Sequence, residues 1–512
     1  MAVIMKFECI CVLMIGICLI APTLGLMGGN FLKIRERVEN YKRESDILKL
    51  KERNRFTMPS FTGSVEIEPE YLTQPLDHFD PRVTLTYQQR HWANDEFWRK
   101  PDGPVFLYIG GEGALSSLAI QNGHIVELAE KYGALLLAVE HRFYGKSVND
   151  DGLELEYIQY LSSQQALADL ASFHHHTVEK YQLTSKNTWI CFGGSYPGAL
   201  SAWFRLKYPH LVFGSIASSA PVRAQTNFQG YNNVVAASLG DPVVKGSKKC
   251  VEMVKAAFKK IDKLISSKQY SILEKDFRSC QPLSNMYDIN QLVSNLAGNF
   301  MGVVQYNNEV PGLNVERICQ RMEKSSDGYE NLKVLNQELL KEQGSNCTDN
   351  SWAHFLKQVM NTHAIAEGVG LRQWLYQTCT QFGYYQTCDQ NTDCIFSKYM
   401  TLQPNIDICT MVFKIPGYLV DKRIQFSNDY YGADRPKGSR IVFVNGSIDP
   451  WHALSVLKDA SASEISIYIN GTAHCANMRS SMPTDPEPLK IARIEISSRI
   501  GHWLKQAKLS QD

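Results

Sequence analysis

One serine in this chain stands in a setting that could make it a nucleophile. Ser195 lies within residues 191–198, Cys-Phe-Gly-Gly-Ser-Tyr-Pro-Gly. The apolar run 188–192 predicts a buried strand before it, and the run 199–208, which ends at Pro209, predicts a helix after it. Small residues at a sharp strand-to-helix turn leave a serine hydroxyl clear, and the N–H groups of the helix N-terminus favour a nearby negative charge. We therefore expect Ser195 to be a nucleophile at such a turn.

The glycine spacing departs from the common Gly-x-Ser-x-Gly pattern. Pro197 stands where that pattern has its last glycine, and Gly198 follows one position later. Proline is tolerated in the first turn of a helix, because its missing N–H would have no helical partner there. The predicted strand and helix on either side thus support the interpretation more than the spacing does.

Two later apolar runs end in residues suited to acid–base chemistry. The run 441–445 leads to Asp449, and the run 465–469 leads to His474. Ligands of parallel α/β sheets gather at the carboxyl ends of strands, and the chain order Ser, Asp, His is that of the α/β-hydrolases. We expect His474 to take the proton of Ser195 and return it to the leaving group. Asp449 would orient the imidazole and stabilise its charged form.

The other candidate groups are weaker or depend on this arrangement. The expected oxyanion donors are the backbone N–H of Tyr196 and one N–H of the glycine-rich loop that includes Gly110 and Gly111. His452 is a rival base, but it lies on the loop assigned to the acid. The run 174–176, His-His-His, lies in a predicted helix without matching ligands, which favours surface histidines. The sequence therefore predicts neither a metal nor a cofactor.

The elements around these residues alternate between strand and helix. Strands are expected at 105–109, 134–140 and 212–217, with helices at 121–132 and from Ser162, whose capping box includes Gln165. Such alternation predicts a mostly parallel α/β sheet. From 223 to 415 the chain is polar and helical instead. We predict an α/β-hydrolase fold, in parts 61–222 and 416–512, with an inserted helical, disulfide-bonded lid at 223–415.

Composition and the N-terminus restrict the class of protein. The chain has 512 residues and a formal net charge of +1, which gives no reason to expect a nucleic acid partner. Residues 1–25, with an apolar run after Lys6, predict a secretory signal peptide, and no second run is long enough to predict a membrane span. The charged residues 26–60 predict a solvated helix or linker, with a removable pro-segment as the alternative.

Cysteines and glycosylation sequons agree with a secretory route. Ten of the 13 cysteines follow the predicted signal peptide, and eight of these cluster in the insertion. They are Cys250, Cys280, Cys319, Cys347, Cys379, Cys388, Cys394 and Cys409. We expect disulfides among them, in a pairing that the sequence leaves open, and a buried thiol at Cys191. Asn346, Asn445 and Asn470 begin sequons, of which Asn346 is the best candidate for glycosylation.

The motifs together resemble a known family over nearly the whole mature chain. The matching stretches are 76–79 (Leu-Asp-His-Phe), 110–113 (Gly-Gly-Glu-Gly), 140–147 (Glu-His-Arg-Phe-Tyr-Gly-Lys-Ser), 165–169, 193–196, 217–222, 374–380 and 445–451 (Asn-Gly-Ser-Ile-Asp-Pro-Trp), with His474. They resemble the prolyl carboxypeptidase and dipeptidyl peptidase II family of serine peptidases, most closely its thymus-specific serine protease branch. The resemblance implies an active site between hydrolase domain and lid, and the same roles for Ser195, Asp449 and His474.

The resemblance also implies an activity and a substrate pocket. It implies an exopeptidase that often acts after a penultimate proline, in lysosomes or outside the cell. Trp451, Trp374 and Glu112 are candidates for the pocket. The family usually has Cys-Thr-Glu where this chain has Gln381, and a carboxylate facing the cleft would be lost there.

Three functional hypotheses follow from these features. The first is a serine exopeptidase on peptide substrates, trimming either end of the chain. The second is an esterase or lipase on the same fold, although the lid is polar and stapled rather than apolar. The third is a binding protein on an inactive hydrolase fold, against which the complete set of Ser, Asp and His argues. The sequence does not decide between a monomer and a homodimer.

Overall fold

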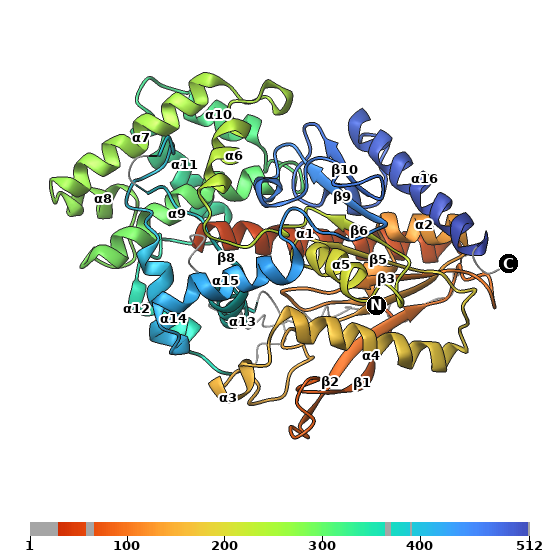
Figure 1. Ribbon diagram of the computed structural model, residues 1–512. Helices are drawn as coiled ribbons and strands as arrows, with labels where there is room; N and C mark the ends of the chain where they lie inside the picture. Colours follow the sequence, from red (N-terminus) through yellow and green to blue (C-terminus); the bar gives the residue numbers. More distant parts are fainter. Residues whose placement is uncertain (1–28, 58–65, 364–369, 390–391, 510–512) are drawn as a thin grey trace, which may run out of the picture.

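The computed structural model describes residues 29–57, 66–363, 370–389 and 392–509 (Figure 1). The predicted signal peptide at 1–25 lies outside these residues. The main strands are β1 Glu70–Pro75, β2 Thr86–Asn94, β3 Val105–Ile109, β4 Leu135–Val139, β5 Trp189–Gly194, β6 Gly214–Ser218, β9 Ile441–Gly446 and β10 Glu464–Ile469. They form one eight-stranded sheet in the order β1-β2-β4-β3-β5-β6-β9-β10.

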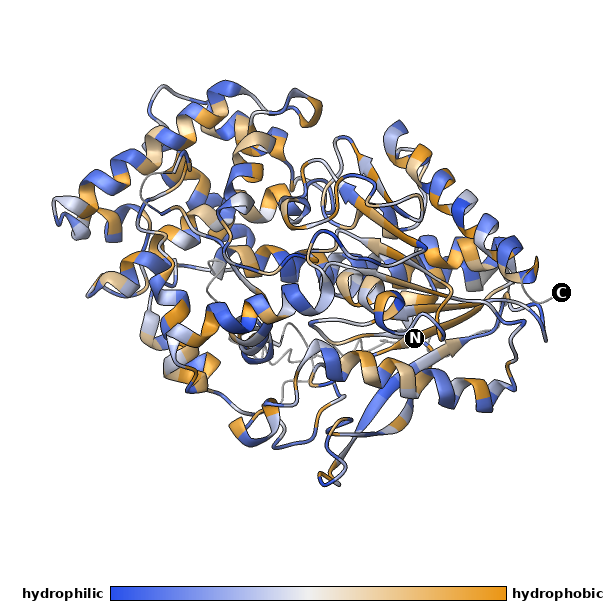
Figure 2. Ribbon diagram, in the orientation of Figure 1, coloured by the Kyte–Doolittle hydropathy of each residue, from blue (hydrophilic) through white to orange (hydrophobic). Residues whose placement is uncertain are grey.

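The sheet is parallel from β4 to β10 and antiparallel only at the β1–β2 and β2–β4 pairs. Helices cover both faces: α2 His124–Tyr132 and α16 Glu487–Leu509 on one, α4 Ser163–Tyr181 and α5 Tyr196–Lys207 on the other. The apolar strands between them form the most hydrophobic layer (Figure 2). This is the predicted α/β-hydrolase fold, with β1 and β2 as an edge that the sequence did not predict.

The segment between β6 and β9 is helical, as predicted. Its helices are α6 Gln229–Leu239, η2 Pro242–Val244, α7 Lys248–Ser266, α8 Tyr270–Asp276, α9 Met286–Gln305, α10 Val315–Met322, α11 Gly328–Glu342, α12 Trp352–Val359, α13 Leu371–Gln377, η3 Thr378–Phe382, α14 Gln403–Phe413 and α15 Gly417–Tyr431. Two short strands, β7 Gln225–Asn227 and β8 Gly383–Tyr385, pair within it. Because α15 packs against η3 and α14, the helical segment continues beyond the expected boundary at 415.

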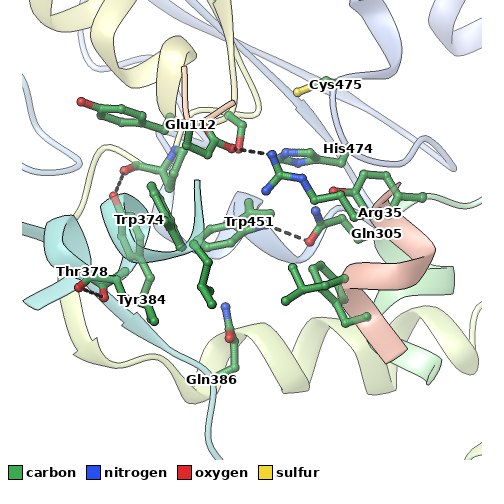
Figure 3. Close-up of a pocket in the computed structure, with 18 of the residues that line it drawn as sticks. Arg35, Glu112, Gln305, Trp374, Thr378, Tyr384, Gln386, Trp451, His474 and Cys475 are labelled. Atoms are coloured by element: carbon green, nitrogen blue, oxygen red, sulfur yellow. Dashed lines mark hydrogen bonds and ion pairs between the residues drawn. The ribbon is translucent and has the colours of Figure 1, made fainter. Parts of the chain in front are cut away.

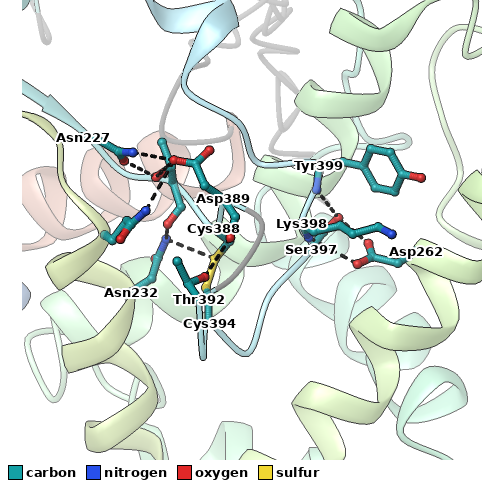
Figure 4. The surroundings of a disulfide bond; sticks show 12 residues. Asn227, Asn232, Asp262, Cys388, Asp389, Thr392, Cys394, Ser397, Lys398 and Tyr399 are labelled. Carbon is teal, nitrogen blue, oxygen red and sulfur yellow. Dashed lines mark hydrogen bonds between the residues drawn. A yellow bond between two sulfur atoms is a disulfide. The ribbon is translucent and has the colours of Figure 1, made fainter.

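All eight clustered cysteines form disulfides, as expected. The pairs are Cys250–Cys319, Cys280–Cys347, Cys379–Cys409 and Cys388–Cys394. Around the last pair, Asp389 accepts a hydrogen bond from Asn227, which ties this loop to β7 (Figure 4). Cys250–Cys319 therefore links α7 to α10 and Cys379–Cys409 links η3 to α14, while the other two bridges join loop residues of the insertion.

The bridges differ in the length of chain that they close, which predicts a difference in their effect on stability. Cys250–Cys319 spans 69 residues and Cys388–Cys394 spans 6. On the chain-entropy account, removing the first by paired Cys→Ala substitution should lower the free energy of unfolding by about 4 kcal/mol, and removing the second by about 2 kcal/mol. Urea unfolding of the two double variants measures the difference. An equal loss in both would contradict the entropic explanation.

The charged N-terminal segment differs from its prediction. It forms α1, Gly29–Thr57, which packs against α9. Phe31, Ile34 and Val38 are buried to 2% exposure or less, so the helix is not solvated on all sides. These three residues recur at i, i+3 and i+7, the spacing of one helix face, within a run of charges. The helix is therefore packed against the insertion, and in Figure 1 it runs across the middle of the molecule.

Several surface predictions can be placed on the structure. Asn346 and Asn470 are exposed, whereas Asn445 is fully buried in β9 and its side-chain amide donates to the carbonyl of Val456. The prediction of glycosylation at Asn445 is therefore wrong, because no glycan could reach that side chain in the folded protein. None of the helices in the described ranges is long and apolar enough to cross a membrane.

The histidine run of α4 divides among different neighbours. His174 packs against Trp189 with ring centroids 4.3 Å apart, and His176 packs against His91. Burial lowers the pKa of His174 to about 4. Only His175 is exposed, so the expectation of surface histidines holds for that residue alone.

Candidate active site

Ser195 lies at the turn between β5 and α5, at the carboxyl end of the sheet. Its backbone angles, φ 64° and ψ −132°, are a strained combination for a residue other than glycine. Its N–H donates to the carbonyl of Ser218 at 2.9 Å, and its own carbonyl accepts from Ala199 at 3.1 Å. Proline at position 197 falls in the first turn of α5, as expected. The surrounding structure thus holds the strained turn in place.

The small residues around Ser195 are required by close packing. A Cβ atom at Gly193 would overlap the carbonyl oxygen of Pro197, and a Cβ atom at Gly111 would overlap the ring of the same proline. The glycine-rich loop after β3 is therefore pressed directly against the start of α5. This contact places the loop beside the nucleophile candidate, as an oxyanion site requires.

One predicted oxyanion donor is wrong. The N–H of Gly110 donates to the carbonyl of Val139 at 2.9 Å, so it is already used by the sheet. Gly111 lies one residue further along, beyond the last strand pairing, and remains a candidate. Tyr196 is the first residue of α5, where helical N–H groups lack intrahelical acceptors. Its side chain points into the core, where its hydroxyl contacts Nε2 of His141 at 2.9 Å.

His474 and Asp449 are brought together by the loops after β10 and β9. Nδ1 of His474 lies 2.9 Å from Oδ1 of Asp449, and the two side chains are 7% and 0% exposed. The same Oδ1 accepts from the N–H of Trp451 at 3.0 Å, which fixes the carboxylate. Burial lowers the pKa of His474, but the facing carboxylate, together with the neighbouring Cys475, outweighs burial and raises this pKa above its usual range. The arrangement favours a positively charged imidazole.

The insertion supports this pair through Gln305, the last residue of α9. Its side-chain oxygen accepts from Nε1 of Trp451 at 2.9 Å (Figure 3). The same oxygen accepts from the hydroxyl of Tyr231 at 2.7 Å. Its backbone carbonyl accepts from the N–H of His474 at 3.1 Å. Sequence reasoning missed Gln305, since a glutamine at the end of a buried helix carries no recognisable signal.

A cavity of about 220 Å³ lies beside Ser195 and His474. Ser195, Tyr196 and His474 line it together with three of the predicted pocket residues, Trp374, Trp451 and Glu112. One face of α1 also lines it, through Phe31, Leu32, Arg35, Val38, Glu39 and Lys42. Sequence reasoning missed this contribution. The only signal was the spacing of Phe31, Ile34 and Val38.

The positions of the Gln381 and His452 side chains do not support the roles considered for them in the sequence. Gln381 is 5% exposed and lies outside the cavity lining. Its side-chain oxygen accepts from the N–H of Ser163 at 2.8 Å, so it satisfies the N-terminus of α4. The assignment of Gln381 to the substrate pocket is therefore wrong. His452 packs against Tyr468 and contacts the carbonyl of Gly446, which removes it as a rival base.

Cys475 gives a chemical test of the cavity. In the part of the chain that the structure describes, Cys191 and Cys475 are the free cysteines. Cys191 is fully buried, and burial raises its pKa to about 11, whereas Cys475 is partly exposed and lines the cavity. We expect N-ethylmaleimide to react at Cys475 and to remove most activity, because the adduct would fill the space beside Ser195. Residual activity after treatment measures this. A Cys475→Ser variant inactivated at the same rate would contradict it.

Comparison with known proteins assigns the chain to a family. Residues 74–496 match the family described as serine carboxypeptidase S28. The chain belongs to this family. It is 39% identical over 450 residues to the thymus-specific serine protease of Homo sapiens, covering 86% of this chain and 87% of that protein. It is 28% identical over 465 residues to the lysosomal Pro-X carboxypeptidase of Bos taurus, covering 86% and 89%.

Membership of the S28 family makes this protein a serine peptidase and confirms the resemblance of its motifs. A solved structure, the proline iminopeptidase of Mycobacterium smegmatis, aligns with 86% of this chain and all of its own, at 10% identity and a TM-score of 0.36. The S28 match begins after α1, so the helix that lines the cavity lies outside the matched residues.

Proposed function

We propose that Ser195, His474 and Asp449 form the catalytic triad of this serine peptidase. His474 takes the proton of Ser195 as its hydroxyl attacks the scissile carbonyl, and returns it to the leaving amine. Asp449 holds the imidazole by its Nδ1–H. The N–H of Tyr196 and an N–H of the loop at Gly111 receive the oxyanion. Water then hydrolyses the acyl-enzyme with His474 acting again as base.

The observation that carries this proposal is the pairing of His474 with Asp449 at 2.9 Å beside a cavity that Ser195 lines. The raised pKa of His474 fits a base that must hold a proton between the two halves of the reaction. The strained conformation of Ser195 adds support, because such strain is found where structure positions a reacting group.

The peptidase trims short peptides at one end, close to proline. One feature supports an exopeptidase: residues of α1 and of the helical insertion line the cavity beside Ser195, so they restrict the approach of a long peptide. Trp374, Tyr384 and Trp451 present aromatic rings to the cavity, a surface suited to a proline ring. The name of one relative, lysosomal Pro-X carboxypeptidase, agrees with a preference for proline.

The protein works in the secretory pathway, in lysosomes or outside the cell. Four disulfides in the insertion support an oxidising compartment. The N-terminal sequence, with the features of a signal peptide, supports the same route.

A peptide library tests the proposed activity. Purified protein would be incubated at acidic and neutral pH with peptides that carry proline second from either end, and the products read by mass spectrometry. Release of a single residue or a dipeptide from one end is expected. Internal cleavage would contradict exopeptidase action, and ester hydrolysis without peptide cleavage would favour an esterase.

A further inference from the structure

The cavity holds a carboxylate that the proposed chemistry does not use. Glu112 follows Gly111 in the loop after β3, and its side chain is 12% exposed and lines the same cavity as Ser195 and His474. A buried carboxylate is costly unless a positive partner compensates it. Its partner in this structure comes from α1, the helix outside the family match.

That partner is Arg35. Its Nη2 lies 3.4 Å from Oε1 of Glu112, and its Nε lies 2.7 Å from Oε1 of Glu39 on the next turn of α1 (Figure 3). The guanidinium therefore makes its shorter contact within its own helix and its longer one across the cavity. Glu112 is held by a cation that is delivered by a separate segment of the chain.

The charges around the cavity favour a further cation rather than an anion. Arg35 is shared between the carboxylates of Glu39 and Glu112, which leaves this group with one negative charge in excess. Lys42, the other lysine or arginine of α1 that lines the cavity, lies 3.1 Å from Glu309. A peptide carboxylate brought to Arg35 would meet two carboxylates. A peptide ammonium brought to Glu112 would meet a compatible charge.

We propose that Glu112 binds the free α-ammonium of peptide substrates, so that the peptidase trims from the amino end, and that Arg35 occupies this position until α1 moves aside. The inference rests on the proposed role of Ser195. Glu112 follows Gly111, the candidate oxyanion donor, and lines the same cavity as Ser195, so an ammonium bound there would lie near the scissile bond.

The test uses the full chain and two reporter substrates that differ only at the amino end. One is Ala-Pro-aminocoumarin with a free amine, and the other is its N-acetyl derivative. Wild-type protein should prefer the free amine about 10- to 100-fold in kcat/KM, the range for a hydrogen bond to a charged group. Glu112→Gln should remove most of this preference, chiefly by raising KM, while it keeps the backbone N–H groups of the loop.

Two further variants separate the parts of the inference. Arg35→Gln should raise kcat/KM for the free-amine substrate, because it removes the competing cation. Glu36→Gln makes the same change of charge as Glu112→Gln on an exposed residue of α1 outside the cavity lining, and it should alter neither substrate. A preference that survives Glu112→Gln, or a preference for the acetylated substrate, would overturn the inference.

Labelling of Ser195 by a fluorophosphonate keeps this inference apart from the proposed function. Suppose that the protein is labelled at Ser195 but removes residues only from the carboxyl end of peptides. This result would overturn the role of Glu112 and leave the triad intact. The role of Glu112 would also be overturned if Ser195 is labelled but neither reporter substrate is cleaved, even by the Arg35→Gln variant. Failure to label and to cleave would instead contradict the triad.

Discussion

Substitution of Ser195 by alanine should reduce kcat by about 10⁶-fold, the loss expected when a serine peptidase loses its nucleophile. Of the described residues that line the cavity, Ser195 and Thr378 carry aliphatic hydroxyl groups, and the hydroxyl of Thr378 donates to the carbonyl of Leu375. Ser195 is therefore the hydroxyl placed to form the acyl-enzyme. The measurement is peptide hydrolysis by purified variant and wild type at equal concentration. The amount of contaminating wild-type protein, measured by active-site titration, sets the lowest activity that can be assigned to the variant.

The variant should remain folded. Alanine keeps the Cβ atom of Ser195, and the hydrogen bonds that fix this turn are made by the backbone, through the N–H to Ser218 and the carbonyl to Ala199. Thermal unfolding of Ser195→Ala should therefore follow that of wild type. An active Ser195→Ala variant with a normal unfolding transition would sink the proposed mechanism.

Substitution of Asp449 by asparagine should reduce kcat by about 10⁴-fold, since the amide no longer stabilises the charged imidazole or holds the required tautomer. The change also shifts the pH dependence. Burial alone lowers the pKa of His474, and the carboxylate of Asp449, together with the neighbouring Cys475, reverses this effect. His474 accepts a proton only above its pKa. In wild type, kcat/KM should therefore rise with pH through a value above 6.5.

Without the carboxylate, the rising limb of the pH profile should move to lower pH. The profile of kcat/KM for both proteins measures the shift. If the limb stays at the same pH in Asp449→Asn, the titrating group is not His474 paired with this carboxylate.

Continuous apolar runs made the central strands predictable, whereas the polar composition of the edge strands β1 and β2 gave no such signal. Strands β3, β4 and β9 consist largely of Val, Ile, Leu, Phe and Ala, and almost all of their residues are buried. β1 and β2 carry buried polar side chains instead. Nε2 of Gln74 donates to Oε1 of Gln89 at 2.8 Å, and Arg90 pairs with Glu140, the residue after β4. Such partners depend on the tertiary fold, so no local pattern indicated these strands.

The candidate triad was predictable because each member follows a strand that the sequence predicts. The surrounding details were not. Gly110 is a glycine in the expected loop, but its N–H belongs to the last pairing with β4, which only the register of the sheet decides. Gln381 stands where the family usually has glutamate, which suggested a place facing the cleft, yet its side chain binds the N-terminus of α4 instead. Arg35 lies among many charged residues, so the sequence did not single it out. Its position beside Glu112 depends on how α1 packs against the rest of the protein.

If Ser195 is the nucleophile of this peptidase, a reagent that reacts with activated serines should modify it covalently. Wild-type protein would be treated with a fluorophosphonate, digested and mapped by mass spectrometry, with Ser195→Ala treated in parallel. A single adduct is expected on the peptide that contains Ser195, together with loss of peptide hydrolysis in step with labelling. Peptide hydrolysis that persists without any adduct at Ser195 would contradict its role as the nucleophile.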